Sequence, residues 1–200
     1  DNDFFVMTKK DIATRNLDVK DFIRCIVRVR DLDGDTVTEH MLDDLDAKGR
    51  PTYLLNLNRT SALTSSTREY LKKGEANGLA SRPLIATRKP WFAMERRDVP
   101  PILFTYLGRR NNRFITNLTN CVPLTGYLCV YPAKGVSTER LLLALNHEDT
   151  WKCIAQLGKS YGSGAIKVEP GALRKLIIPN SALEEAGLQK AEIEPSLGSE

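Results

Sequence analysis

The chain has 200 residues, 42% of them hydrophobic and 27% charged, which suits one globular domain, or at most two small ones, with a core large enough to fold alone. No apolar run approaches the ~20 residues that span a bilayer, and no basic-then-apolar leader opens the chain, so we expect no membrane anchor. The net charge is only +4, but residues 82–113 hold eight lysines and arginines against two acidic residues, a pattern typical of proteins that bind a polyanion.

The N-terminal half predicts short strands and helices in alternation. Residues 4–7, 24–30 and 53–57 are predicted strands, and residues 9–20 and 67–77 are predicted helices, the second ended by Gly78. Residues 31–35 contain part of a calcium-loop pattern, but His40 stands where that loop needs glutamate, which favours a plain acidic turn. The acidic residues 43–46 are predicted to form a solvated loop.

From residue 88 the sequence becomes rich in strands. Proline, glycine and asparagine signals separate predicted strands at 91–94, 102–106, 114–116 and 127–131. Ser137 is the predicted N-cap of a helix that ends at residue 145, and Asp149 the predicted cap of a second helix. Residues 161–179 predict a glycine-rich turn, a strand at 166–168, a helical turn begun by Pro170, and a strand at 176–178.

Strands and helices interleave without a regular βαβ alternation, which predicts an α+β fold with a mixed or antiparallel sheet and flanking helices. We assign residues 1–180 to the domain and the polar residues 181–200 to a loose C-terminal tail. The four cysteines, Cys25, Cys121, Cys129 and Cys153, lie far apart among apolar neighbours. This pattern favours buried, reduced thiols over disulfides or a zinc site, and therefore a cytoplasmic location.

Residues 88–117 combine cationic, amide and aromatic side chains in one stretch. Arginine can contact phosphates or guanine, and asparagine can pair with adenine. Residues 108–113 connect two predicted strands, so their side chains should project from a hairpin tip that fits a nucleic-acid groove. The candidate DNA contacts of this stretch are Arg88, Arg96, Arg97, Arg109, Arg110, Asn111, Asn112, Arg113 and Asn117. The alternative is a solvated hairpin; for the aromatic residues we favour a place in the core, and these are Trp91, Phe92, Phe104 and Phe114.

A second candidate segment is the glycine-rich stretch KSYGSG at residues 159–164. Its backbone N–H groups and its lysine can contact phosphate, although a plain helix stop explains the glycines equally well. Its candidate DNA contacts, with the strand that follows, are Lys159, Tyr161, Ser163 and Lys167.

No pattern in the chain predicts catalysis. Val99-Pro100-Pro101-Ile102 contains the proline pair of the Asp/Asn/Ser-Pro-Pro-aromatic tetrapeptide of DNA amino-methyltransferases, but it lacks the hydrogen-bond acceptor and the ring that hold a flipped base. No glycine-rich strand-to-helix turn followed by an acidic residue offers a site for S-adenosylmethionine. A nuclease would need clustered carboxylates beside the cationic stretch, and the sequence places none there.

The order of several segments is that of one known family. These segments are Arg88-Lys89-Pro90-Trp91-Phe92, residues 101–106, residues 113–117, Leu141-Leu142-Leu143-Ala144-Leu145-Asn146, and residues 161–173 with their closing Glu169-Pro170 and the apolar run up to Pro179. In this order they resemble the C-terminal target-recognition domains of adenine-specific DNA methyltransferases of restriction-modification type.

The resemblance implies a division of labour. A catalytic methyltransferase domain, in the same chain or a partner chain, would bind S-adenosylmethionine and methylate adenine. This chain would bind double-stranded DNA and recognise its sequence, with no cofactor and no catalysis of its own. Specificity subunits of multisubunit restriction enzymes share the closing segment and are one alternative, and a protein-interaction or regulatory domain for an acidic partner is another.

Overall fold

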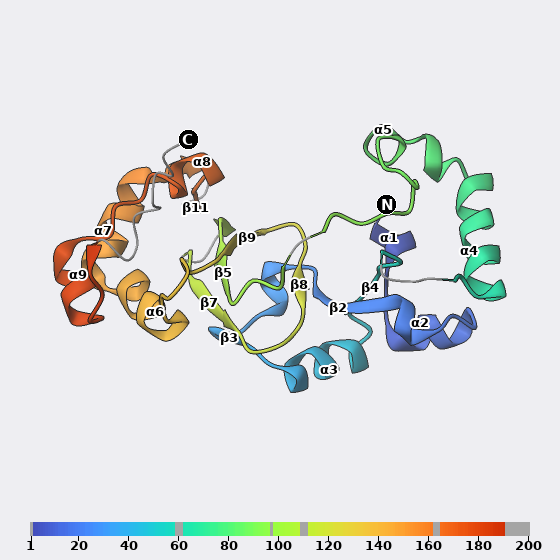
Figure 1. The fold of residues 1–200 in the computed structure, drawn as a ribbon, viewed down its shortest axis with the longest axis horizontal. Coiled ribbons are helices and arrows are strands. Elements are labelled where there is room, and N and C mark those ends of the chain that lie inside the picture. The colour runs from blue at the N-terminus through green and yellow to red at the C-terminus, as the bar shows by residue number, and fades with distance from the viewer. Residues whose placement is uncertain (1, 59–61, 97, 109–111, 162–164, 191–200) are drawn as a thin grey trace. The chain divides into compact units, whose positions relative to one another are not determined.

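The computed structural model describes residues 2–58, 62–96, 98–108, 112–161 and 165–190 (Figure 1). The chain folds into two compact units, each built from three separate segments. The first unit comprises Asp1–Val27, Thr38–Val99 and Thr119–Val122, and the second comprises Arg28–Val37, Pro100–Leu118 and Pro123–Glu200. Neither unit is therefore a continuous stretch of sequence.

The first unit is built on a small sheet with the strand order β1-β4-β2-β8. Its strands are β1 (Val6–Met7), β4 (Tyr53–Leu55), β2 (Phe22–Ile26) and β8 (Val122–Pro123), of which Val122 belongs to this unit. β4 pairs antiparallel with both β1 and β2. The helices and 3-10 turns of this unit are α1 (Asn2–Phe5), α2 (Lys9–Thr14), η1 (Val19–Asp21), α3 (Glu39–Ala47), α4 (Ser65–Ala76), η3 (Leu79–Ser81) and α5 (Pro83–Ala86).

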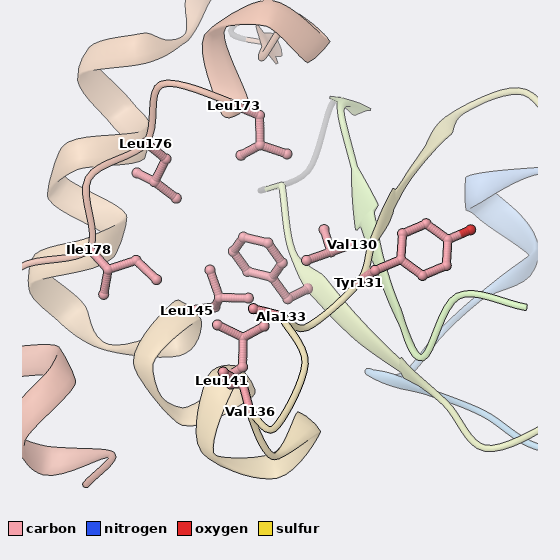
Figure 2. Close-up of a pocket in the computed structure, with 10 residues that line it drawn as sticks. Val130, Tyr131, Ala133, Val136, Leu141, Leu145, Leu173, Leu176 and Ile178 are labelled. Carbon is pink, nitrogen blue, oxygen red and sulfur yellow. The ribbon is translucent and has the colours of Figure 1, made fainter. Parts of the chain in front are cut away.

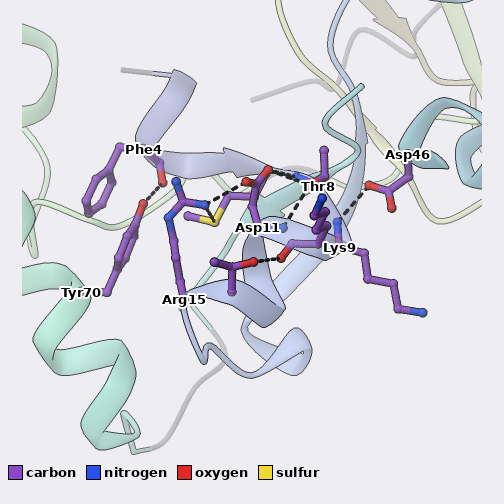
Figure 3. Close-up of polar contacts among 10 residues, drawn as sticks. Phe4, Thr8, Lys9, Asp11, Arg15, Asp46 and Tyr70 are labelled. Carbon is purple, nitrogen blue, oxygen red and sulfur yellow. Dashed lines mark hydrogen bonds and ion pairs between the residues drawn. The ribbon is translucent and has the colours of Figure 1, made fainter. Parts of the chain in front are cut away.

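Local hydrogen bonds explain where the helices of the first unit begin. The Thr8 hydroxyl accepts from the Asp11 amide while the Asp11 carboxylate accepts from the Thr8 amide, a reciprocal cap that starts α2 (Figure 3). The N-terminal segment is also held to two other helices: the Lys9 amide donates to Asp46 of α3 at 2.9 Å, and the Tyr70 hydroxyl of α4 donates to the Phe4 carbonyl at 2.8 Å.

The second unit contains two sheets. The larger has the order β3-β7-β5-β9 and consists of β3 (Thr36–Val37), β7 (Phe114–Asn117), β5 (Ile102–Thr105) and β9 (Tyr127–Val130). β5 pairs antiparallel with β7 and β9, and β3 pairs parallel with β7. The smaller sheet has the order β10-β11-β6 and consists of β10 (Lys159–Tyr161), β11 (Ala165–Lys167) and β6 (Leu107–Gly108). The turn η2 (Val29–Asp31) and the helices α6 (Thr138–Asn146), α7 (Glu148–Leu157), α8 (Pro170–Leu173) and α9 (Asn180–Glu185) complete it.

The core of the second unit lies between the larger sheet and its helices. All four residues of β5 are buried, as expected for a central strand covered on both faces. Phe104 of β5 and Phe114 of β7 lie 4.8 Å apart between ring centroids, and Trp151 of α7 packs against both rings. The predicted α+β fold with mixed sheets and flanking helices is therefore confirmed.

An apolar pocket opens beside this core (Figure 2). Residues from β9, α6 and the segment after α8 surround it, and its volume is about 280 Å³. Its lining residues are Phe114, Val130, Tyr131, Ala133, Val136, Leu141, Leu145, Leu173, Leu176 and Ile178. Ligand sites in proteins combine an apolar wall with a few converging polar groups, and among these lining residues only the tyrosine carries one.

Two predicted strands are wrong, for reasons that the contacts explain. At 91–94 the chain turns, and the Asn58 side-chain amide bonds both the amide and the carbonyl of Met94, as a neighbouring strand would. Residues 176–178 form no strand with any of the described residues, and the apolar side chains Leu176 and Ile178 pack on the core of the second unit.

Three other predictions need correction. The acidic residues 43–46 lie in α3, because Thr38 caps that helix and Leu42 is buried beneath it. The N-cap of α7 is His147 and not Asp149: the His147 Nδ1 accepts a hydrogen bond from the Asp149 backbone amide at 3.1 Å. The N-terminal apolar run is half helix and half strand, with α1 preceding β1.

The predicted C-terminal tail is also ordered over its first part. Residues 180–185 form α9, and Leu183 and Leu188 are each 5% exposed. Arg140 Nε of α6 donates to the Ala186 carbonyl at 3.0 Å, which fixes the end of α9. The rest of the predicted tail, residues 191–200, lies outside the described residues.

Burial is confirmed for two of the four cysteines. Cys25 and Cys121 are completely buried, and this burial raises the pKa of both thiols, while Cys129 and Cys153 are half-buried. Within the described ranges, no helix is long and apolar enough to cross a membrane.

Candidate nucleic-acid interface

The two candidate segments, which are about fifty residues apart in sequence, meet in the smaller sheet of the second unit. β6, the start of the predicted hairpin, pairs antiparallel with β11, which follows the glycine-rich stretch, in the register Ile166↔Gly108 and Lys167↔Leu107. The Val168 amide donates to the Tyr106 carbonyl at 3.0 Å and extends the contact by one residue. The sheet thus joins the strand that leads into the predicted hairpin tip to the strand that carries Lys167.

Two lysines face each other across this sheet. Lys159 of β10 and Lys167 of β11 are direct partners in the antiparallel register, an arrangement in which like charges repel. Glu169 offsets part of this repulsion, because its carboxylate lies 2.7 Å from the Lys167 ammonium group. The hydrogen bond from Lys167 lowers the pKa of Glu169, and the charges of Lys167 and Lys159 lower it further. Lys159 is exposed to solvent, and Tyr161 lies at the other end of β10.

The described end of the hairpin is held by a compact set of hydrogen bonds around Thr105. The Asn112 side-chain amide donates to the Thr105 carbonyl at 2.7 Å, and Asn112 is only 7% exposed. The Arg113 backbone amide donates to the Thr105 hydroxyl at 2.9 Å, and the Thr105 amide donates to the Arg113 carbonyl at 3.1 Å. The Asn112 amide nitrogen therefore serves the protein's own backbone in this structure.

Two further candidates, Arg113 just before β7 and Asn117 at its end, also have internal partners. The Arg113 guanidinium donates to the Leu32 carbonyl and lies 3.4 Å from the Asp35 carboxylate. The Asn117 side-chain amide donates to the Pro100 carbonyl at 2.9 Å, and Asn117 is 8% exposed. Both side chains thus tie β7 to neighbouring segments of the second unit.

The remaining candidates fall into two groups. Arg88 and Arg96 belong to the first unit: Arg88 is half-buried, with its guanidinium 5.9 Å from the Phe5 ring centroid and 3.9 Å from the Met94 sulfur, while Arg96 is exposed. The others lie outside the described residues, and these are Arg97, Arg109, Arg110, Asn111 and Ser163.

The aromatic residues of the basic stretch are divided between the two units. Phe104 and Phe114 are buried core residues of the second unit, as predicted. Trp91 and Phe92 are half-buried in the first unit, where Trp91 contacts the rings of Phe4 and Phe5 at 5.8 and 6.1 Å. The Trp91 indole also donates to Glu75 at 2.8 Å. The Arg-Lys-Pro-Trp-Phe motif therefore fastens the N-terminal segment to α4.

Sequence patterns do not mark most of the residues that bond the candidate DNA contacts. Thr105, Asp35 and Glu169 were not candidates, although each bonds a predicted one. Glu169 stands in a recognisable Glu-Pro pair next to Lys167, which is a usable signal. Asp35 gave no signal, because 78 positions separate it from Arg113 and only the fold brings them together. Of the described residues, no three His, Cys, Asp or Glu side chains are grouped so as to hold a metal ion.

Two comparisons with known proteins agree with this architecture. Residues 1–197 match the family described as the C-terminal domain of the Type II methyltransferase M.Eco57I. The chain is 30% identical over 178 residues to the Type II methyltransferase M.AccI of Acinetobacter calcoaceticus, a match that covers 87% of this chain and 33% of that relative. The chain thus spans about one third of the length of the relative that it matches. It belongs to the family of C-terminal domains of Type II methyltransferases represented by M.Eco57I.

Proposed function

We propose that this chain is the DNA-recognition domain of an adenine-specific methyltransferase of a restriction-modification system, and that it binds double-stranded DNA without catalysing a reaction. The pairing of β6 with β11 carries the proposal, because it unites the predicted hairpin with the lysines that follow the glycine-rich stretch. A β-hairpin or two-stranded ribbon is narrow enough to enter the major groove.

The lysine pair supports a phosphate-binding role for the smaller sheet. The two lysines are direct partners in the register of β10 and β11, and the Glu169 carboxylate pairs with the Lys167 ammonium group. A DNA phosphate would relieve the repulsion between Lys159 and Lys167, and this provides a favourable electrostatic contribution to binding.

The candidate residues then take separate roles. The proposed phosphate contacts are Lys159, Lys167, Arg88, Arg96 and Arg97, and Tyr161 and Ser163 are further proposed DNA contacts. The proposed base contacts come from the hairpin and comprise Arg109, Arg110 and Asn111. Asn112, Arg113 and Asn117 bind internal partners in this structure, so they support the hairpin and its strands.

A catalytic domain elsewhere in the longer protein would bind S-adenosylmethionine and transfer its methyl group to adenine. The match to a relative three times as long supports such a parent, and a DNA substrate would place it in the cytoplasm. A specificity subunit that pairs with a separate methyltransferase chain would use the same DNA contacts.

The proposal is tested by measuring duplex DNA binding of the full-length protein as a function of salt concentration. The slope of log K against log salt is negative, and its magnitude decreases by roughly 0.9 for each phosphate contact that is lost. The double substitution Lys159→Ala and Lys167→Ala should therefore weaken binding at low salt and reduce the magnitude of the slope by about 1 to 2.

The matched control is Lys134→Ala, which removes one exposed positive charge from the loop between β9 and α6 of the same unit. It should leave the slope nearly unchanged. Absence of duplex DNA binding, or displacement of the DNA by acidic polypeptides as readily as by duplex DNA, would instead support a domain that binds an acidic protein.

A further inference from the structure

Arg113 was a candidate for reading bases, yet the contacts of its guanidinium are within the second unit. One nitrogen, Nη2, donates to the Leu32 carbonyl, and another, Nη1, lies 3.4 Å from the Asp35 carboxylate. Its side chain is 29% exposed, and Leu32 is 3% exposed. The side chain therefore joins the start of β7 to the segment at residues 32–35.

That segment is itself bound to β7 through the main chain. The Thr116 amide donates to the Asp35 carbonyl at 2.9 Å, and β3 continues in parallel with β7 in the register Thr36↔Thr116. Asp35 thus contacts β7 through its carbonyl oxygen and, through its carboxylate, the arginine that directly precedes this strand. An ion pair that reinforces a strand pairing orients that strand more firmly than the pairing alone.

The opposite side of residue 113 is fixed by Thr105. Three hydrogen bonds close the described end of the hairpin: the Thr105 amide donates to the Arg113 carbonyl, the Arg113 amide donates to the Thr105 hydroxyl, and the Asn112 side-chain amide donates to the Thr105 carbonyl. Two residues after Thr105, the chain becomes β6, which pairs with β11 and thereby sets the position of Lys167. The orientation of β7 is thus transmitted to the sheet that carries the proposed phosphate contacts.

We infer that Arg113 and Asp35 are positioning residues for DNA recognition: their ion pair, with the hydrogen bond to the Leu32 carbonyl, orients the β5–β7 hairpin, and Arg113 makes no contact with DNA. This inference rests on the proposed function and assigns to an acidic residue a role in binding a polyanion.

The sign of one substitution separates this inference from simple electrostatics. Removing a negative charge near a DNA-binding surface strengthens binding if charge alone matters. Asp35→Asn should instead weaken binding, because the amide keeps the size of the side chain and loses the ion pair. Asp33, an exposed acidic residue two positions away, provides the matched control, and Asp33→Asn should leave binding unchanged or strengthen it slightly.

The experiment measures duplex DNA affinity and its salt slope for the full-length protein and for four variants: Asp35→Asn, Asp33→Asn, Arg113→Lys and Arg113→Ala. Asp35→Asn should bind DNA about two- to fivefold more weakly, the loss that corresponds to a partly exposed ion pair. Arg113→Lys should lose about as much affinity as Arg113→Ala, since one ammonium group does not reproduce the two directed contacts of the guanidinium. The salt slope should stay the same in all four variants.

Several outcomes would overturn the inference. Binding by Asp35→Asn that equals or exceeds that of the unsubstituted protein would show that the ion pair does not position the hairpin. A direct phosphate contact would reduce the magnitude of the salt slope by roughly 0.9 in Arg113→Ala, and Arg113→Lys would restore the slope and most of the affinity. Thermal unfolding of each variant checks that it is folded. If Asp35→Asn is not folded, the salt slopes of the two Arg113 variants decide whether Arg113 contacts a phosphate. If the unsubstituted protein does not bind duplex DNA, the proposed function itself fails, a result distinct from all of these.

Discussion

At the scale of single residues, the side chains of the basic stretch have different tasks although the sequence gives them similar chemistry. Asn112 and Asn117 donate to backbone carbonyls and are nearly buried, whereas Lys159 is exposed on a sheet edge strand. A buried amide is stabilised by the hydrogen bonds that it makes inside the protein, and their loss would leave a polar group unpaired. Residue type therefore indicates what a side chain can bind, and its burial decides what it does bind.

Gly74 on α4 gives a residue-scale prediction for the first unit. A Cβ at this position would lie 2.7 to 2.9 Å from the rings of Phe4 and Trp91, and Phe4 is stacked on Tyr70 at 4.4 Å, so the rings have little freedom to move away. Gly74→Ala should lower the free energy of unfolding by about 1 to 3 kcal/mol, as overpacking usually does.

Chemical denaturation of both variants tests this, with Gly171→Ala as the control. Gly171 lies in helix α8 with no atom near its added Cβ, and there alanine should be neutral or stabilise by up to about 1 kcal/mol. A Gly74→Ala variant as stable as the control would contradict the packing around Phe4 and Trp91.

At the scale of elements, caps and long-range packing contribute differently to the helices of the second unit. Ser137 begins α6 by accepting from the Arg140 amide, and Pro170 begins α8, both as the local sequence indicates. α9 follows no such signal: its sequence is polar and no side chain caps it, but α6 and α7 cover its apolar residues. Its stability therefore comes from the partners that it packs against.

Leu183 tests whether α9 is a structural part of the second unit. Leu183 is 5% exposed and belongs to a cluster with Ala144, Ala186 and Leu188. Leu183→Ala should lower the free energy of unfolding by about 2 to 5 kcal/mol, because it removes buried methyl groups and leaves a cavity. Leu143→Ala on α6 is the control: Leu143 is 62% exposed, and its truncation should cost less than about 0.5 kcal/mol. Equal small effects would mean that α9 does not pack in solution.

At the scale of the whole molecule, each unit is assembled from three separate segments of the chain. The proposed DNA contacts are distributed accordingly, with Arg88 and Arg96 in the first unit and the hairpin and lysine pair in the second. Neither unit alone contains every proposed contact.

Methylation by the full-length protein provides the prediction at this scale. With S-adenosylmethionine and duplex DNA it should produce methylated adenine, which nucleoside analysis of the digested DNA identifies. The Lys159→Ala and Lys167→Ala variant should raise the KM for DNA and leave the affinity for S-adenosylmethionine unchanged, because these lysines would contact only DNA. Methylated cytosine in place of methylated adenine would disprove the adenine specificity, and a weakened cofactor affinity would place the lysines in the catalytic machinery.

The sequence by itself determined those features that depend on near neighbours: the α+β class, the strands β5, β7 and β9, the Ser137 cap, and the order of motifs that indicated the family. Tertiary structure alone decided which cationic and amide side chains the protein uses internally, and that β6 pairs with β11. The physical reason is distance along the chain. A cap is stabilised by residues a few positions away, and an apolar strand is recognised from its own residues. The partners of Arg113, in contrast, stand 78 and 81 positions before it, and no local pattern encodes them.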